Sequence, residues 1–342
     1  MMRKLIAIGL ILTLLLSGCR KEQPATTEPT TTEPITQPTT APSTPETEAT
    51  IPETEPPLTG WQEIDGQRVF YQEDGTLHTG WLEDAGHRYY LSENGSPLTG
   101  WLELDNQRYY MNEDGSMHIG WLEQDGARYY FNAEGIMARG RIMISDEETR
   151  YFTSTGKEVI LVNPWNFVPD DYEPELTTYQ SWIVSAECAD DLSQMLKDCK
   201  KAGFTAVVTS AYRTHSYQAG LYQRRIDRFV AQGYSRDKAE IEAAKRVAYP
   251  GTSEHELGLA VDIVDASDQN LTAQQETMPA QRWLIENSWR YGFILRYPNE
   301  KTDKTGIIYE PWHYRYVGKE LAQELHVTDL CLEEYLEALT EE

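Results

Sequence analysis

A twenty-residue repeat is the feature that most restricts what the N-terminal half of this chain can fold into. Gly-Trp pairs begin at positions 60, 80, 100 and 120, and Gly140 keeps the register with Arg141 in place of Trp. Three units also contain a Tyr-Tyr pair, the first has Val69-Phe70 at that place, and a turn signal such as Asp74-Gly75 follows in all four. Short aromatic strands separated by such turns predict β-hairpins. Because a single hairpin is marginal in water, we expect about five units, over residues 58–157, to stack into a β-hairpin solenoid.

The segment before the repeats has two parts with different compositions. Residues 1–18 contain two basic residues and an apolar run from Leu5 to Leu16, which is short for a membrane-spanning helix but typical of a signal peptide. Residues 19–57 are dominated by Thr, Pro and Glu, and residues 20–57 hold nine of the seventeen prolines. Such a composition cannot bury enough apolar surface to fold, so we expect a disordered linker.

The end of the apolar run, Leu16-Ser17-Gly18-Cys19, resembles a bacterial lipobox. The resemblance implies that Cys19 carries lipid after cleavage. The protein is then expected on the outer face of the bacterial cytoplasmic membrane, held by lipid only and reaching into the cell wall. An ordinary signal peptide with a chance cysteine is the alternative. The formal net charge of −25 argues against nucleic acid as a partner.

The repeats resemble the cell-wall-binding units of choline-binding and glucan-binding surface proteins. The choline-binding form implies aromatic cages that hold a quaternary ammonium by cation–π attraction. One cage aromatic usually stands just before the aromatic pair, and a guanidinium there would repel a cation, so we do not expect choline binding. Stacking of Trp81 or Trp101 on wall polysaccharide, binding of teichoic acid and a purely structural stalk all stay open. The four basic residues at the cage position are Arg68, Arg88, Arg108 and Arg128.

Residues 158–342 have a globular composition in which helices and short strands mix without regular β-α-β alternation. This pattern predicts an α+β domain with a small mixed or antiparallel sheet and flanking helices. The expected helices cover residues 190–202, 215–232, 235–247 and 281–291, and the expected strands lie within 205–210, 257–264 and 307–317.

Two segments of this domain carry the residue types of a metal centre. His255, Asp262 and His313 form a plausible three-ligand zinc set with a fourth position left for water. Glu310, three residues before His313, is the candidate to take a proton from that water. In a straight strand, His255 and Asp262 would lie ~23 Å apart. The chain must therefore bend between them, and Gly258 is the natural place.

A second local constraint concerns Glu310. Pro311 disfavours an α conformation for the residue before it, so we expect Glu310 and His313 to meet across a turn.

The joint pattern resembles the zinc-dependent D-alanyl-D-alanine carboxypeptidases of the VanY type and the related L,D-carboxypeptidases. The resemblance covers most of residues 161–320 and rests on the Ser-x-His-x-x-Gly-x-Ala-x-Asp run from Ser253. It also includes the segments Ser210–Arg213, Phe293–Pro298 and Glu310–Gly318.

The resemblance implies one Zn²⁺ per catalytic domain and removal of C-terminal D-Ala from peptidoglycan stem peptides by metal-activated water. It implies that Glu310 is the general base and that Arg213 stabilises the developing oxyanion. Gln218 and Ser253 would hold the terminal D-Ala, and Trp312 and Tyr297 would line the pocket. A D,D- and an L,D-bond are both open as the target. An endopeptidase that cuts cross-links and a catalytically inactive wall-binding lipoprotein are the alternatives.

Three cysteines remain beyond Cys19. Cys188 and Cys199 lie eleven residues apart on one expected helix. That spacing corresponds to ~16 Å, which exceeds disulfide reach. Either could pair with Cys331, or all three could be small buried side chains.

Overall fold

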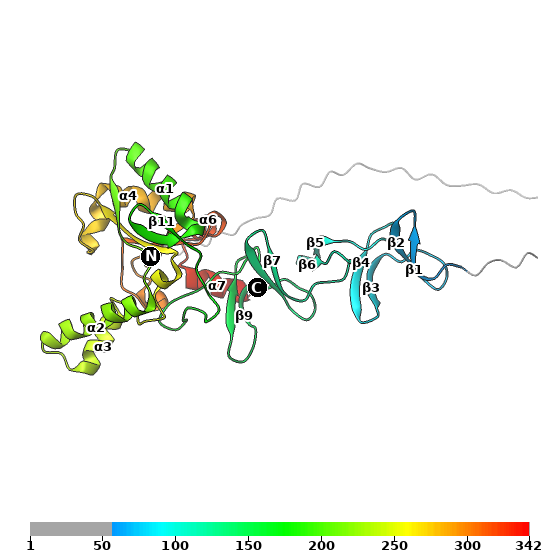
Figure 1. The fold of residues 1–342 in the computed structure, drawn as a ribbon, viewed down its shortest axis with the longest axis horizontal. Coiled ribbons are helices and arrows are strands. Elements are labelled where there is room, and N and C mark those ends of the chain that lie inside the picture. Colours follow the sequence, from blue (N-terminus) through cyan, green and yellow to red (C-terminus); the bar gives the residue numbers. More distant parts are fainter. Residues whose placement is uncertain (1–56, 342) are drawn as a thin grey trace, which may run out of the picture. The chain divides into compact units, whose positions relative to one another are not determined.

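The computed structural model describes residues 57–341 of the chain (Figure 1). The predicted signal peptide, Cys19 and nearly all of the linker lie outside these residues. The described residues 57–341 belong to one compact unit. Within the described part, none of the helices combines the length and the apolar character that a membrane crossing requires.

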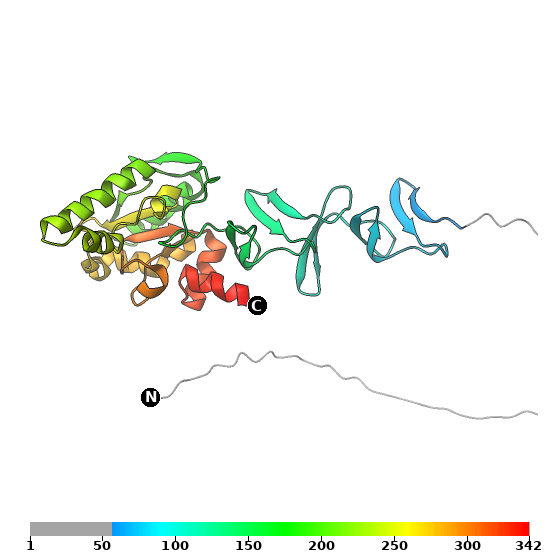
Figure 2. The same ribbon diagram turned by 90° about the horizontal axis from the view of Figure 1, so that it is seen from below.

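The repeats fold as five successive antiparallel hairpins, which confirms the periodicity argument (Figure 2). In the first hairpin, Asp65 and Gly66 form the turn with φ values of 51° and 76°. These left-handed conformations match the twist of the flanking strands. The hairpins are β1 (Gly60–Ile64) with β2 (Gln67–Tyr71), β3 (Gly80–Asp84) with β4 (His87–Leu91), β5 (Gly100–Leu104) with β6 (Gln107–Met111), β7 (Gly120–Gln124) with β8 (Ala127–Phe131), and β9 (Gly140–Met143) with β10 (Thr149–Phe152).

Contacts between neighbouring units turn the row of hairpins into a solenoid. Trp81 packs edge-on against Tyr109 of the next unit, with ring centroids 5.0 Å apart. The backbone N–H of Met117 donates to the carbonyl of Arg88 at 2.7 Å. Equivalent contacts recur one period later. Each unit therefore buries its aromatic face against a neighbour, as expected for hairpins that are too small to be stable alone.

The rest of the chain is α+β, as predicted. Its four-stranded sheet has the order β13-β14-β16-β15, and all of its pairings are antiparallel. The sheet strands are β13 (Ala206–Ser210), β14 (Ala260–Asp265), β15 (Phe293–Leu295) and β16 (His313–Tyr316), and a separate hairpin consists of β11 (Leu176–Tyr179) and β12 (Trp182–Ser185). The helices are α1 (Ala186–Lys201), α2 (His215–Ala231), α3 (Arg236–Ala244), α4 (Pro279–Asn287), α5 (Thr302–Thr305), α6 (Lys319–Thr328) and α7 (Leu332–Glu341).

Among the element boundaries that differ from the sequence prediction, two have a clear local reason. Helix α1 begins four residues earlier than expected, because the side chain of Ser185 accepts a hydrogen bond from the backbone N–H of Glu187 and caps the helix. The strand predicted from Leu257 begins only at Ala260, because residues 254–257 form a 3₁₀ turn.

The main core lies between α1 and the sheet. Leu192 and Met195 of α1 are fully buried in the same cluster as Val261, Ile263 and Tyr314 of the central strands. All three cysteines of the described domain are buried and free. The interpretation as small buried side chains is therefore the one that the structure supports, and the proposed pairing with Cys331 is absent.

The last repeat packs against the C-terminal helices. The backbone N–H of Arg141 donates to Thr340 Oγ1 at 2.8 Å, and Val159 and Leu161 share a core with Leu321 and Leu336. The expected boundary at residues 157/158 thus falls inside a packed region and not in a free linker.

Candidate metal centre

A bend at Gly258 places the first candidate ligand. His255 lies in the 3₁₀ turn Glu254–Leu257, and Gly258 ends this turn with a φ of 75° before the chain enters β14. A Cβ at Gly258 would also lie 3.1 Å from the backbone nitrogen of Ser185. Glycine is therefore required for both conformation and space, and the bend predicted from the sequence is confirmed.

The sheet places the other two candidate ligands side by side. Asp262 in β14 and His313 in β16 are direct partners across an antiparallel ladder. Asp262 Oδ1 lies 3.1 Å from His313 Nδ1, and Asp262 Oδ2 lies 3.3 Å from His255 Nε2. One ligand atom from each residue lies within 4.8 Å of the other two. Two imidazoles and one carboxylate that converge in this way have the donor set and spacing of a zinc site with an open position.

The outward ring nitrogens are fixed by partners that leave the inward nitrogens available as donors. His255 Nδ1 is 2.8 Å from the carbonyl of Ala211, and His313 Nε2 is 3.3 Å from Glu254 Oε2. If both outer nitrogens carry the proton, His255 Nε2 and His313 Nδ1 present lone pairs to the centre. Metal-binding histidines are usually oriented by such carbonyl and carboxylate partners.

Glu254 is a buried part of this arrangement. Its carboxylate contacts the candidate ligand His313 and two arginines instead of solvent. Arg296 Nε and Arg315 Nη1 contact Glu254 Oε1 at 2.7 and 3.0 Å. Burial opposes ionisation of this carboxyl, but the two guanidiniums outweigh it and hold the pKa of Glu254 well below its usual range. Glu254 is therefore a fixed negative charge behind His313.

The two histidines differ in the metal-free protein. Burial and the positive charge of Arg213 lower the pKa of His255 to about 4. Burial also disfavours the charged form of His313, but contacts with Asp262 and Glu254 raise its pKa to about 9. His255 is thus already a neutral ligand at pH 7, whereas His313 must release a proton when it binds a metal ion.

Glu310 meets His313 across the predicted turn. The backbone N–H of His313 donates to the carbonyl of Glu310 at 3.1 Å. Burial, reinforced by the charge of Asp262, raises the pKa of Glu310 to about 8. A carboxyl with a raised pKa beside a candidate metal site is suited to proton transfer near neutral pH.

Arg213 is held beside the ligand Asp262. Its Nη2 contacts Asp262 Oδ2 at 3.1 Å and Ser210 Oγ at 2.9 Å, and its Nη1 contacts Gln218 Oε1 at 3.2 Å. Gln218 is fully buried, and its Nε2 donates to the carbonyl of Ala248 at 2.8 Å. The amide of Gln218 therefore orients Arg213 from behind, and Gln218 is not among the residues that line the cavity described next. Its contact with substrate stays a prediction.

A cavity of about 310 Å³ joins the predicted site residues. The three candidate ligands line it together with Glu310, Arg213 and three predicted substrate contacts, Ser253, Tyr297 and Trp312. Two lining residues, Arg225 and Arg246, have no local sequence signal, because only the fold places α2 and the segment after α3 at this cavity. The remaining walls are Leu221, Val247, Ala248, Glu254, Leu271, Ile307 and Ile308.

In the repeats, arginine side chains stack on tryptophan rings. The guanidinium carbon of Arg88 lies 4.5 Å from the ring centroid of Trp81, and the corresponding distance from Arg68 to Trp61 is 3.7 Å. The other two stacked pairs have distances of 4.6 and 4.3 Å. The indole face that a quaternary ammonium would need is therefore covered by the protein's own cation. The stacked pairs are Arg68–Trp61, Arg88–Trp81, Arg108–Trp101 and Arg128–Trp121.

The fold and the cluster together define a peptidase-type domain that follows choline-binding-type hairpin repeats. A family model for the D-alanyl-D-alanine carboxypeptidase VanY matches residues 182–319, and a choline-binding repeat model matches residues 58–96, 98–133 and 118–165. The chain belongs to the VanY family of D-alanyl-D-alanine carboxypeptidases.

Individual relatives match the same part of the chain. A D-alanyl-D-alanine carboxypeptidase of Enterococcus faecalis is 42% identical over 179 residues, which are 52% of this chain and 65% of that protein, just under two thirds. The bifunctional D-Ala-D-Ala dipeptidase and carboxypeptidase VanXYC of Enterococcus gallinarum is 35% identical over 39% of this chain and 67% of its own length. A solved structure of a mutant D,D-pentapeptidase VanY with Zn(II) is 40% identical over 52% of this chain and 97% of that chain, with a TM-score of 0.48.

Proposed function

We propose that this protein is a zinc-dependent carboxypeptidase that removes C-terminal D-Ala from peptidoglycan stem peptides. The observation that carries the proposal is the convergence of His255, Asp262 and His313 in one cavity with Glu310. These three side chains would hold the zinc ion, which when bound supplies a Lewis acid for the scissile carbonyl and acidifies water. The names of the relatives from Enterococcus support D-Ala as the residue released.

The protein's own groups have distinct tasks in this mechanism. Glu310 takes the proton of the attacking water and returns it to the leaving amine. Arg213, fixed by Ser210 and Gln218, presents a positive charge for the oxyanion that develops on the scissile carbonyl. Ser253 and Tyr297 form walls of the cavity in which the terminal D-Ala would be oriented.

The test is product analysis with the zinc-loaded protein. A pentapeptide ending in D-Ala-D-Ala and a tetrapeptide ending in a single D-Ala would be incubated separately, and released D-Ala measured by mass spectrometry. Release from the pentapeptide supports D,D-specificity, and release from the tetrapeptide alone supports the L,D alternative. A cross-linked dimer added to the same assay would be cut if the protein is an endopeptidase. Hydrolysis of none of these peptides would favour the alternative of a catalytically inactive wall-binding protein.

We also propose that Cys19 is lipidated and that the linker carries the repeats and the enzyme into the cell wall from the outer face of the membrane. The lipobox-like Leu16–Cys19 sequence and the Thr/Pro/Glu-rich linker support this location. Partitioning of the protein into detergent phase is expected for the native chain and is expected to be lost in Cys19→Ala.

For the repeats, we propose wall polysaccharide or teichoic acid as the ligand in preference to free choline. The covered faces of Trp81 and Trp101 count against free choline, and they also count against stacking of these two rings on sugars, so other groups of the repeats would bind the ligand. Co-sedimentation with purified peptidoglycan, with and without its teichoic acid, tests the proposal. Competition by choline would contradict it.

A further inference from the structure

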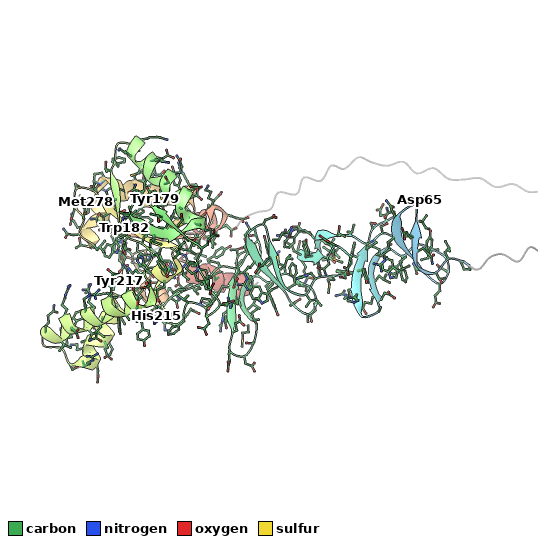
Figure 3. All side chains as sticks on the ribbon, in the orientation of Figure 1. Asp65, Tyr179, Trp182, His215, Tyr217 and Met278 are labelled. Atoms are coloured by element: carbon green, nitrogen blue, oxygen red, sulfur yellow. The ribbon has the colours of Figure 1, made fainter. Side chains whose placement is uncertain are left out.

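Two arginines line the same cavity as the candidate metal ligands but take no part in the mechanism above. Arg225 comes from α2, and Arg246 from the segment just after α3. These two helices lie side by side as a pair in the ribbon (Figure 1), and His215 and Tyr217 mark the start of α2 (Figure 3). The helix pair therefore supplies one charged wall of the cavity.

Neither arginine has a partner of its own, unlike basic residues close to it. Arg236 contacts Glu240 at 3.0 Å and Lys245 contacts Glu242 at 2.9 Å. Within residues 57–341, no carboxylate oxygen lies within the 4.0 Å of an ion pair from Arg225 or Arg246, and neither side chain forms a hydrogen bond. Two acidic residues of α3, Glu240 and Glu242, are thus already engaged by other basic side chains.

The two guanidiniums also repel one another. Burial and the charges of Arg228 and Arg246 lower the pKa of Arg225, and Glu310 is the one nearby acid that opposes this effect. Like charges that share a cavity wall raise its positive potential and attract anions. This cationic wall is a specific feature, because the protein as a whole has a formal net charge of −25.

Arg225 and Arg246 differ from Arg213 in their contacts with the metal centre: among residues 57–341, neither forms an ion pair or a hydrogen bond with a candidate metal ligand. The ring of His215, at the start of the helix, contacts Glu256, the residue after the ligand His255, at 3.0 Å. Arg225 lies ten residues further along the helix, which corresponds to about 15 Å. Arg213, by contrast, contacts the ligand Asp262 directly.

We propose that Arg225 and Arg246 bind a carboxylate of the substrate other than its terminal one, upstream of the scissile bond. This inference rests on the proposed peptidase function and adds a substrate class to it, peptides that carry a free side-chain or α-carboxylate. Arg213 and Ser253 are left for the end of the peptide at the metal centre. The two arginines then act on affinity and not on the chemical step.

The experiment uses three pentapeptides that all end in D-Ala-D-Ala. The first has an amidated second residue and lysine third, the second has a free carboxylate on the second residue, and the third has a free carboxylate on diaminopimelate at position three. Binding to the zinc-loaded full chain is measured by calorimetry in a Glu310→Gln background, so that slow turnover does not interfere. The same series carries Arg225→Gln, Arg246→Gln or the control Arg224→Gln, an exposed arginine on α2 that does not line the cavity.

We expect at least one carboxylate-bearing peptide to bind about five- to thirtyfold more tightly than the amidated one, and this preference to shrink in high salt. Arg225→Gln and Arg246→Gln are each expected to remove most of the preference, and Arg224→Gln to keep it. Equal affinity of the wild-type arginine set for all three peptides would overturn the proposal. An equal loss of the preference in all three arginine variants would overturn it as well. Failure of the wild-type protein to release D-Ala would instead refute the proposed function, since the calorimetric preference does not depend on turnover.

Discussion

The arginines of the repeats and the arginines of the cavity are in opposite situations. Arg88 stacks on Trp81, faces Glu83 at 3.5 Å and donates to the carbonyl of Glu134 at 3.4 Å. Arg225 and Arg246 line a cavity without an ion-pair partner among residues 57–341. An arginine therefore has a structural role where the fold supplies an ion-pair partner and a stacked ring, and it is a candidate binding group where the fold supplies no ion-pair partner. This difference indicates which of the many charged residues can recognise a ligand.

Of the two regions compared, the cavity is the one expected to react with substrate. Removing the carboxylate of Glu310 from this cavity has the largest expected effect. Glu310→Gln keeps the shape but cannot accept a proton, so we expect kcat for D-Ala release to fall about 10²- to 10⁴-fold. Zinc content, measured by mass spectrometry of the metal, is expected to stay at the wild-type level. Unchanged turnover would contradict the role of Glu310 as the base.

Glu254 extends the comparison to a buried charge of the C-terminal domain that, unlike Arg225 and Arg246, has ion-pair partners. Glu254→Gln leaves the buried guanidiniums of Arg296 and Arg315 without their shared carboxylate. We expect a loss of about 3–5 kcal/mol in the free energy of unfolding, measured by denaturant titration. We also expect zinc affinity to fall about 10- to 100-fold, because His313 loses its outer partner. A variant with native stability would show that the ion cluster is not important.

Zinc binding is expected to depend on pH in a direction fixed by His313. Because the pKa of His313 is about 9 in the metal-free protein, this ring is protonated at pH 7 and zinc must displace its proton. Affinity should therefore rise about tenfold per pH unit between pH 6 and 8 and level off above the pKa of His313. Competition with a chelator at several pH values measures it. A flat profile would mean that His313 is already neutral.

The smallest effect is expected from the ion-paired, stacked arginines of the repeats. Arg88→Ala removes one stacked cation and one exposed ion pair, so we expect a loss of about 1 kcal/mol in stability, measured by thermal unfolding. The variant also uncovers Trp81, and its fluorescence should respond to tetramethylammonium where the wild type does not. Arg139→Ala, which removes an exposed arginine from the same region, is the control. A fluorescence response of the wild-type protein to tetramethylammonium would show that the stacked arginines do not block the tryptophan rings.

The regular parts of the molecule could be predicted because their signals are local. Period, turn dipeptides and aromatic pairs determine the hairpins within a few residues, so β3 and β4 follow from the sequence around Trp81 alone. The metal cluster was predicted from residue types, and the bend at Gly258 from the distance that two ligands of one ion can tolerate.

The parts that escaped prediction depend on contacts between distant segments. Arg296 and Arg315 reach Glu254 across 42 and 61 residues of sequence, so nothing near Glu254 shows that it is a buried ion. Arg225 and Arg246 look like ordinary exposed helix charges until the fold places them at the cavity. The hairpin formed by β11 and β12 was also not predicted.

The ties made by the repeat arginines have a consequence for how such a chain can change in length. Arg68 and Arg88 each reach a carbonyl 46 residues ahead, and Arg108 reaches Thr155 in the segment after the last hairpin. Arg128 contacts Glu158 in the same segment at 3.0 Å. If an interior unit is duplicated or deleted, each repeat arginine still finds a partner further along the chain. The last hairpin and the segment after it, in contrast, contact both the stack and the C-terminal helices. Gene duplication can therefore change the length of the hairpin stack while the junction with the C-terminal domain stays the same.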